Sequence, residues 1–168
     1  MRRSQERMRG LKEVRIEFAS PDEASRIAEI LGAAFAEFEG FYTPEAFAAT
    51  VLNSDEIRKR FEEEGAIWTA RKNGEIAGTV SVVPEGEKLY VRSMAVLPSA
   101  QGLGIAQKLL ETVEEFAIEN EFESLFLYTT PFLLSAIRLY KINGFKRGEE
   151  VDWFFGTPLF EMDKKLKG

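Results

Sequence analysis

The spacing of hydrophobic residues changes several times along the chain, and each spacing predicts a type of element. Apolar and polar residues alternate with the two-residue period of a strand in two segments, 14–18 and 89–97, and further strands are predicted at 66–71 and 75–83. Apolar residues recur at helical spacing in five segments, which begin after Ser20, Thr43, Ser54, Gly104 and Thr130. Three further strands are predicted at Leu125–Thr129, Val151–Phe155 and Leu159–Leu166.

The resulting order is β-α-α-α-β-β-β-α-β-α-β-β, which predicts an α/β (α+β) fold. Asn73-Gly74 indicates a hairpin between the second and third strands. The helix after the fourth strand indicates one β-α-β crossover. We therefore expect a mixed, mostly antiparallel sheet of about seven strands with helices on both faces. We expect residues 14–168 to form a single domain and residues 1–13 to form a mobile basic arm.

Composition narrows the chemistry. The chain has 168 residues, 45% of them hydrophobic, which is enough for one core. It contains neither cysteine nor histidine, so a cysteine nucleophile is excluded and we expect no metal site. The net charge is −6, although residues 1–15 carry six basic and two acidic side chains. An acidic body argues against a nucleic-acid partner and is compatible with a cationic acceptor.

No apolar run approaches the ~20 residues of a membrane span, and the first ten residues lack the apolar centre of a signal peptide. We therefore expect a cytoplasmic protein without a membrane partner.

The most informative stretch joins the fourth strand to its helix through two glycines, Gly102 and Gly104. The first turn of a helix carries unpaired N–H groups and the positive end of the helix dipole, so this junction can bind an anion. A phosphate-binding P-loop would end in Gly-Lys-Ser/Thr, which is absent. A dinucleotide fingerprint would have glycine or alanine where Gln107 stands. An ordinary strand–helix turn is the alternative.

The segment Gln101-Gly102-Leu103-Gly104-Ile105-Ala106 resembles the Arg/Gln-x-x-Gly-x-Gly/Ala signature of the GNAT superfamily of N-acetyltransferases. The resemblance implies that the loop amides hold the pyrophosphate of acetyl-CoA. It also implies a bulge in the preceding strand, whose amides pair with the pantetheine arm, and a Val96 N–H that polarises the thioester carbonyl. Gln101 replaces the more common arginine, so we expect binding of the cofactor phosphates to depend on the backbone amides of the loop. Lys108 either assists in binding these phosphates or is a solvated helix lysine.

A second segment, Ser135 to Phe145, resembles the Asn-x-x-Ala-x-x-x-Tyr-x-x-x-Gly-Phe stretch of the same family. By this register Tyr140 is the general acid that protonates the departing thiolate. A core tyrosine on an amphipathic helix is the alternative. Leu133 stands where the family often has asparagine, so that contact is absent or has moved, for example to Ser135. The implied cofactor-binding residues are Met94, Ala95, Val96, Gln101, Gly102, Leu103, Gly104, Ile105, Ala106, Gln107, Ser135 and Tyr140.

The group that deprotonates the amine is not evident from the sequence. Glu87, at the start of the fourth strand, is one candidate base, and a water chain ending on Glu87, Glu37 or Glu39 is another. The acceptor should lie between the early helices and the closing hairpin, with Asp152 as a candidate ammonium partner. The aromatic residues of those segments are Phe35, Phe38, Phe41, Tyr42, Trp153, Phe154 and Phe155.

The resemblance thus implies an acetyl-CoA-dependent N-acetyltransferase that acts on a small-molecule or peptide primary amine. The absence of cysteine favours direct transfer in a ternary complex over a thiol-linked acyl-enzyme. Two alternatives remain open: a non-catalytic acyl-CoA-binding or sensory module of the same fold, and an α/β interaction domain that binds no nucleotide. Pairing of the last strands across a homodimer also remains open.

Overall fold

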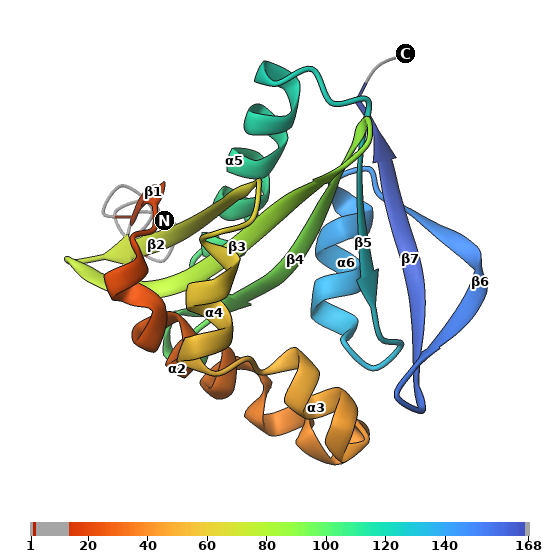
Figure 1. Cartoon of the computed structure of the whole chain (residues 1–168), viewed down its shortest axis with the longest axis horizontal. Coiled ribbons are helices and arrows are strands. Elements are labelled where there is room, and N and C mark those ends of the chain that lie inside the picture. Colours follow the sequence, from red (N-terminus) through yellow and green to blue (C-terminus); the bar gives the residue numbers. More distant parts are fainter. Residues whose placement is uncertain (1, 3–13, 167–168) are drawn as a thin grey trace.

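Seven strands form one mixed sheet in the order β1-β2-β3-β4-β5-β7-β6 in the computed structural model, which describes residue 2 and residues 14–166 (Figure 1). Only β4 and β5 pair in parallel; all other neighbours are antiparallel. The strands are β1 (Val14–Phe18), β2 (Ala66–Lys72), β3 (Glu75–Glu85), β4 (Lys88–Val96), β5 (Ser124–Thr129), β6 (Lys146–Phe154) and β7 (Thr157–Lys165). The predicted arm lies, apart from residue 2, outside the described residues.

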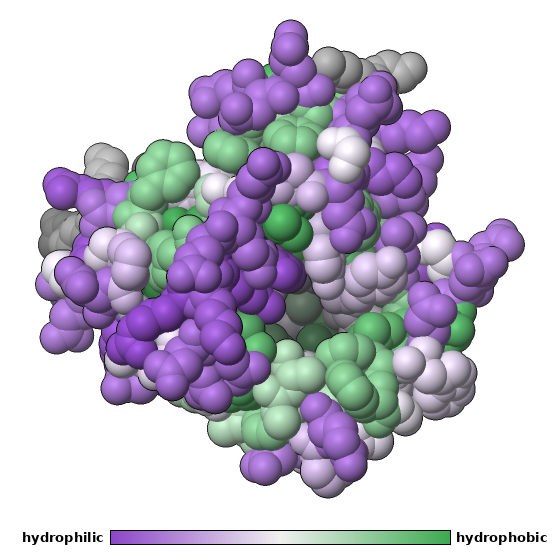
Figure 2. Space-filling view, viewed as in Figure 1, coloured by the Kyte–Doolittle hydropathy of each residue, from purple (hydrophilic) through white to green (hydrophobic). Residues whose placement is uncertain are grey.

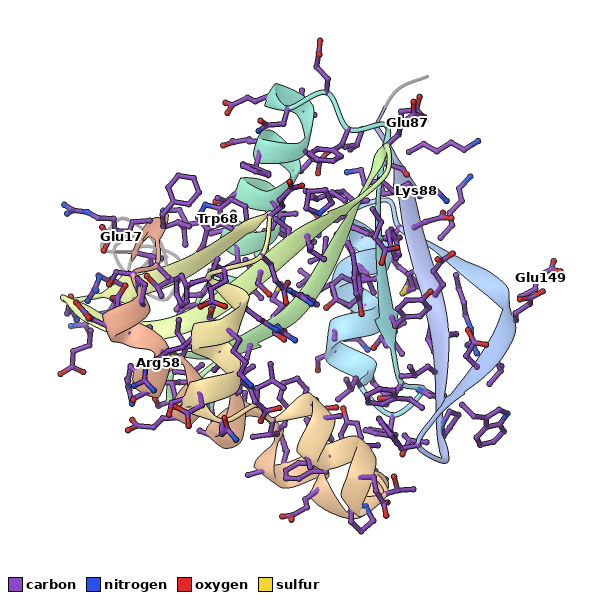
Figure 3. The ribbon with its side chains drawn as sticks, in the orientation of Figure 1. Glu17, Arg58, Trp68, Glu87, Lys88 and Glu149 are labelled. Carbon is purple, nitrogen blue, oxygen red and sulfur yellow. The ribbon has the colours of Figure 1, made fainter. Side chains whose placement is uncertain are left out.

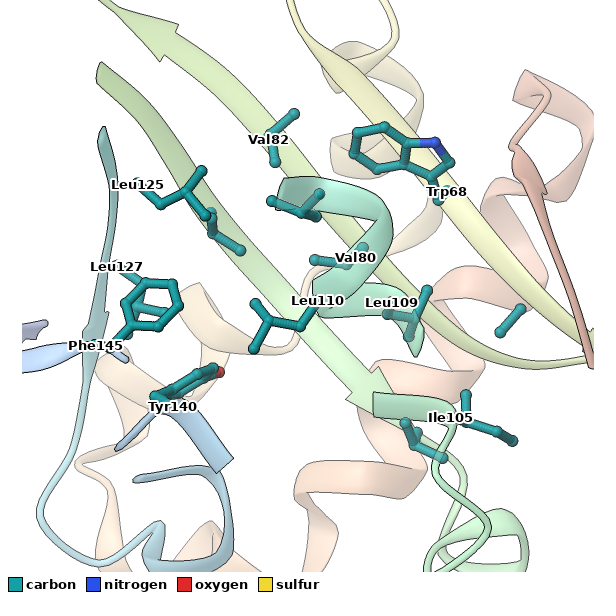
Figure 4. Close-up of a cluster of buried hydrophobic side chains, with 14 of the residues drawn as sticks. Trp68, Val80, Val82, Ile105, Leu109, Leu110, Leu125, Leu127, Tyr140 and Phe145 are labelled. Carbon is teal, nitrogen blue, oxygen red and sulfur yellow. The ribbon is translucent and has the colours of Figure 1, made fainter. Parts of the chain in front are cut away.

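Helices cover both faces of the sheet, as expected. They are α2 (Ala24–Phe35), α3 (Pro44–Thr50), α4 (Ser54–Arg60), α5 (Ile105–Glu119) and α6 (Leu134–Ile142), with 3-10 turns at Pro21–Glu23, Ala36–Phe41 and Pro98–Ala100. On one face, apolar residues of α2 and α4 pack with Ile67, Ile76 and Ala95. On the other face, α5 and α6 enclose the larger core (Figure 4). No helix in the described part of the chain is long and apolar enough to cross a membrane.

Local sequence signals explain several element boundaries. Ser20 N–H donates to Glu23 Oε1 at 2.9 Å, which completes the capping box that begins the first helical segment. The hairpin between β2 and β3 turns at Asn73 and Gly74, whose φ angles are 52° and 81°. Both features were predicted from the residues alone.

Two predicted boundaries are wrong. Helix α6 begins at Leu134 rather than next to Thr130. Residues 130–133 form a turn instead, in which Leu133 N–H donates to Thr130 O at 3.2 Å and Leu133 has a non-helical ψ of 68°. Strand β6 begins at Lys146 rather than Val151. Its first half is polar and exposed, and its register against β7 is irregular between Arg147 and Val151, so it lacks the alternation that marks a strand.

The feature that positions the site is the divergence of β4 and β5. These parallel strands pair only at Lys88↔Ser124, Leu89↔Leu125 and Tyr90↔Phe126. Beyond these pairs they separate, so the later half of β4 has no strand partner on that edge (Figure 1). The backbone groups of this edge are therefore available to a ligand in the wedge between the two strands.

Candidate active site

A bulge in β4 lies beside the wedge. Against β3 the register runs from Thr79↔Ala95 to Ser81↔Arg92, so Val80 is opposed by two residues of β4. Ser93, the first residue of the bulge, has a φ of 55°. The structure thus contains the bulge that the family resemblance implied, and the bulge comprises Ser93 and Met94, directly before Ala95 and Val96.

The Val96 amide points into the wedge. Leu97 N–H donates to Ala77 O of β3 at 2.8 Å. Because successive residues of an extended chain direct their N–H and C=O groups to opposite edges, the groups of Val96 face away from β3. In agreement, Val96 O accepts a hydrogen bond at 3.3 Å from Gln101 Nε2 in the following loop, outside the β3 ladder.

The loop after β4 presents a series of unpaired backbone donors. Gly102 and Gly104 have φ angles of 83° and 84°, and the first helical hydrogen bond runs from Lys108 N–H to Gly104 O at 3.1 Å. None of the N–H groups of residues 102–107 donates to another described residue. A Cβ built on Gly102 would meet no atom within 4 Å, so the backbone there borders open space. The loop is therefore a cradle of six N–H groups at the start of α5, suited to an anion with several oxygens.

Side chains around this cradle are engaged elsewhere. Gln101 reaches back to Val96 O, and Lys108 Nζ donates to Val14 O of β1 at 2.9 Å. Lys108 is thus directed to β1, which leaves the suggested helper role without support. The donors that remain around the cradle are backbone groups.

An amide pair connects the two helices that border the wedge. Gln107 Nε2 donates to Asn143 Oδ1 at 2.8 Å, and Asn143 Nδ2 donates to Gln107 Oε1 at 2.7 Å. Asn143 Nδ2 also caps α6 by donating to Leu139 O at 2.8 Å. The pair fixes the start of α5 against the end of α6, three residues beyond Tyr140. The Gln107 side chain is thus structural, while its N–H remains part of the cradle.

We expect this pair to be cooperative. In a double-mutant cycle of Gln107→Ala and Asn143→Ala, the coupling energy should be about 1 kcal/mol, because each single change removes both hydrogen bonds of the pair and leaves the amide oxygen of the other residue without its donor. Urea unfolding measures all four free energies. Glu111→Ala removes only an exposed contact to Gln107 and serves as the control, with an expected loss below about 0.5 kcal/mol. Additive single changes would contradict a reciprocal pair.

Tyr140 occupies the second position that the family resemblance singles out. It lies on α6, is 8% exposed and packs against Phe145 with 5.7 Å between ring centroids. Its hydroxyl forms no hydrogen bond within the described chain, and the oxygen points away from Phe145 (Figure 4). Burial raises the pKa of Tyr140, so the hydroxyl stays protonated and can donate a proton or a hydrogen bond.

The raised pKa predicts a change in stability at high pH. An unfolded tyrosine ionises near pH ~10, so above that pH the unfolded state releases a proton that the folded state keeps, and the free energy of unfolding falls. Between about pH 9.5 and 11 this fall should be shallower in Tyr140→Phe than in the parent protein. Urea unfolding at both pH values gives the two slopes. Equal slopes would mean that the hydroxyl is solvated.

Thr129 was missed by the sequence analysis. It is the last residue of β5, beyond the point where β4 and β5 separate, and its Oγ1 is buried without a hydrogen-bond partner. An unpaired buried hydroxyl is costly unless a ligand or water satisfies it. No pattern in the sequence marks this threonine, because its role depends on where β5 leaves β4.

The remaining predicted site residues are placed less favourably. Ser135 is exposed in the first turn of α6. Glu87 lies in the turn before β4 (Figure 3), nine residues from Val96, which corresponds to roughly 30 Å along a strand. Glu87 is therefore too far from the Val96 amide to take a proton directly from an amine bound there. Glu37 and Glu39 are exposed in the 3-10 turn after α2.

Tyr90, Phe126 and Tyr128 form an aromatic row on the sheet face that α2 and α4 cover, in a part of that face beyond these two helices. Tyr90 stacks on its register partner Phe126 at 5.0 Å, and Tyr128 meets Tyr90 edge-on at 5.8 Å. Tyr128 is 41% exposed, and desolvation raises its pKa, as do the charges of Glu161, Asp152 and Glu85. Figure 2 shows a hollow at the centre of this face, between hydrophilic residues over α4 and apolar ones over α3.

The predicted aromatic pocket is only partly assembled. Phe38, Phe41 and Tyr42 gather around Phe132, with ring centroids 6.2, 5.3 and 4.8 Å from it. Trp153 and Phe155, on the hairpin of β6 and β7, are 70% and 60% exposed. Asp152 is exposed on β6 but contributes to the electrostatics of Tyr128. The row of Tyr90, Phe126 and Tyr128 was not predicted.

Comparison with known proteins agrees with this architecture. The chain is 31% identical over 135 residues to the uncharacterized N-acetyltransferase YjgM of Escherichia coli (strain K12), covering 77% of this chain and 78% of that protein. Its match to the probable N-acetyltransferase family 8 member 5 of Mus musculus, 30% identical, spans 44% of that longer protein.

Solved structures share the fold. The ribosomal-protein-S18-alanine N-acetyltransferase of Escherichia coli aligns with a TM-score of 0.76 at 16% identity, covering 92% of this chain and 95% of that one. The PaiA N-acetyltransferase of Thermoplasma acidophilum, solved in complex with coenzyme A, aligns with a TM-score of 0.73 at 18% identity, covering 90% and 98%. A family model described as the acetyltransferase (GNAT) family matches residues 25–145. The chain belongs to the GNAT family of acetyltransferases.

Proposed function

We propose that this protein transfers an acetyl group from acetyl-CoA to a primary amine, directly within a ternary complex. The observation that carries the proposal is the cradle of six unpaired N–H groups at residues 102–107, placed where β4 leaves β5. The coenzyme A complex of a protein with the same fold supports the choice of ligand.

The residues present fit coenzyme A. The cradle has the donors that a pyrophosphate requires, and the unpaired edge of β4 at Met94, Ala95 and Val96 can pair with the amides of a pantetheine arm. The buried, unpaired Thr129 Oγ1 offers a further hydrogen bond at the opposite wall of the wedge. Acetyl-CoA supplies an activated acyl thioester and a thiol leaving group.

The protein's own groups divide the remaining tasks. The Val96 N–H, directed into the wedge, polarises the carbonyl at which negative charge develops. The protonated Tyr140 hydroxyl donates to the departing sulfur. The acceptor enters from the face of the aromatic row. Glu161, the register partner of Tyr128 on β7, takes the amine proton through water. A cysteine-linked intermediate is impossible because the chain has no cysteine.

The proposal is tested by incubating the protein with acetyl-CoA and a broad panel of amines and following release of free coenzyme A. We expect acceptor-dependent release and an acetylated product of matching mass. Coenzyme A binding without acetylation of any amine would instead indicate a non-catalytic acyl-CoA-binding module. Failure to bind acetyl-CoA at millimolar concentration would contradict both.

A further inference from the structure

Two arginines from separate elements converge beside the bulge of β4. Arg60, the last residue of α4, donates from Nη1 to Ser93 Oγ at 2.6 Å and to Ser81 Oγ at 3.3 Å. Arg92 lies on β4, directly before Ser93, and its Nη2 pairs with Glu63. The structure thus holds the Arg60 guanidinium against the bulged segment that leads to Val96.

Most of the donors of this arginine pair are unused. Arg60 Nε and Nη2 and Arg92 Nη1 donate to no described residue, and Arg92 Nε is buried without a partner. The Arg92 side chain is only 20% exposed, so water satisfies little of it. A buried, unpaired guanidinium N–H is costly, which indicates that an acceptor group belongs there.

The local charge is also unbalanced. Desolvation and the charge of Arg92 lower the pKa of Arg60 to about 10, so Arg60 remains charged at neutral pH. Glu63 is the one carboxylate that forms an ion pair with them among the described residues, and it is 42% exposed. Glu56 also acts on Arg60 but forms no ion pair with either arginine among the described residues, so only one carboxylate contacts the two guanidinium groups and a ligand anion would complete their pairing.

The pair borders a cavity and the aromatic row. A cavity of about 340 Å³ beside the end of α4 is lined by Arg60, Arg92, Glu63 and Ser81 on one side and by residues of β1, β2 and α5 on the other, so it lies on the β2 side of the pair. The charges of both arginines act on Tyr90, which stacks on Phe126. The hydrophilic surface over α4 in Figure 2 forms one margin of the central hollow. The arginines therefore lie beside the aromatic row, at the face from which the acceptor enters.

We propose that the acceptor is an amino acid, whose carboxylate is bound by Arg60 and Arg92 while its amine lies at the wedge. This inference rests on the proposed function. Planar guanidinium groups match a carboxylate in a bidentate arrangement. Ser93 and Val96 are three residues apart, roughly 10 Å along a strand, so the two ends of one small molecule can reach both places. The carboxylate that Arg60 and Arg92 bind is either the α-carboxylate or the carboxylate of an acidic side chain.

Matched acceptors test this on the unaltered protein. The panel consists of free amino acids, their α-carboxamides and the corresponding decarboxylated amines, with asparagine and glutamine as the neutral partners of aspartate and glutamate. We expect the best amino acid to exceed its carboxamide, or its side-chain amide, by ~10- to 100-fold in kcat/KM, mainly through KM. Calorimetry with coenzyme A present should show the same preference in binding.

Variants identify the residues responsible. Arg60→Gln and Arg92→Gln should bring the ratio of acid to amide to within about threefold of one, chiefly by raising KM for the acid. Arg58→Gln is the matched control: Arg58 lies on the same helix, is half exposed, pairs with Asp55 and sits apart from the wedge (Figure 3). It should keep the full preference. Thermal unfolding checks that each variant is folded.

Three results would overturn the inference, and each has a different meaning. Equal use of carboxamides or carboxylate-free amines by the parent protein contradicts carboxylate recognition but leaves the acetyltransferase proposal intact. Binding of acetyl-CoA without transfer to any amine contradicts the proposed function, and the inference with it. A preference for acids that survives both Arg60→Gln and Arg92→Gln also contradicts the assignment.

Discussion

Replacing Gly102 by valine is expected to weaken acetyl-CoA binding by more than about 100-fold in a chain that remains folded. Gly102 has a φ of 83°, and a Cβ placed there projects into open space in front of the cradle. The side chain would therefore occupy the position of the phosphate oxygens instead of colliding with protein. Backbone strain should cost only about 1–2 kcal/mol of stability. Calorimetric titration with acetyl-CoA measures the affinity, and thermal unfolding measures the fold.

Gly86→Val is the matched control for this prediction. Gly86 also has a positive φ, 59°, and open space around its Cβ, but it lies in the turn between β3 and β4, at the opposite end of β4 from the loop. It should incur a comparable backbone strain without loss of affinity. If Gly102→Val binds acetyl-CoA within about threefold of the parent, the amides of residues 102–107 do not form the phosphate site.

Replacing Tyr140 by phenylalanine should lower kcat by about 100-fold and leave the affinity for acetyl-CoA unchanged. The change removes only a hydroxyl that is unpaired in the structure, so the packing against Phe145 is kept. Without this donor the thiol leaves as an unprotonated thiolate, which is a poorer leaving group in an apolar wedge. Single-turnover kinetics with a saturating acceptor separate this step from product release.

Measuring both acetyl-CoA affinity and kcat distinguishes a proton-donor role of Tyr140 from a structural one. A structural role would lower stability or acetyl-CoA affinity along with kcat, whereas a proton donor affects kcat alone. A kcat within threefold of the parent, with both substrates bound normally, would remove Tyr140 from the chemistry. The proton would then reach the sulfur from water.

Much of the fold was predictable because its signals are local. Hydrophobic spacing gave the order of the strands and helices, and Asn73-Gly74 identified the hairpin of β2 and β3. The start of β6 was not predictable, because residues 146–150 are exposed on both faces of an edge strand and show no alternation. The turn before α6 was missed because a threonine followed by proline also fits a helix start.

The site was less predictable, because its key feature is a relation between distant segments. The sequence pattern identified the glycine loop and Tyr140 but could not show where β4 and β5 separate. The row of Tyr90, Phe126 and Tyr128 depends on strand register, and the Arg60–Arg92 pair joins residues that are 32 positions apart. Glu87 was considered as a base because it precedes the right strand, but sequence position alone does not give its distance from Val96 along that strand.

Amide hydrogen exchange, measured residue by residue by NMR with and without coenzyme A, tests the central claim most directly. Because the N–H groups of residues 102–107 lack acceptors, they should exchange quickly in the free protein. Coenzyme A should slow their exchange, and that of Val96, more than that of any other amide. Unchanged exchange across residues 102–107, with protection appearing elsewhere, would contradict the account.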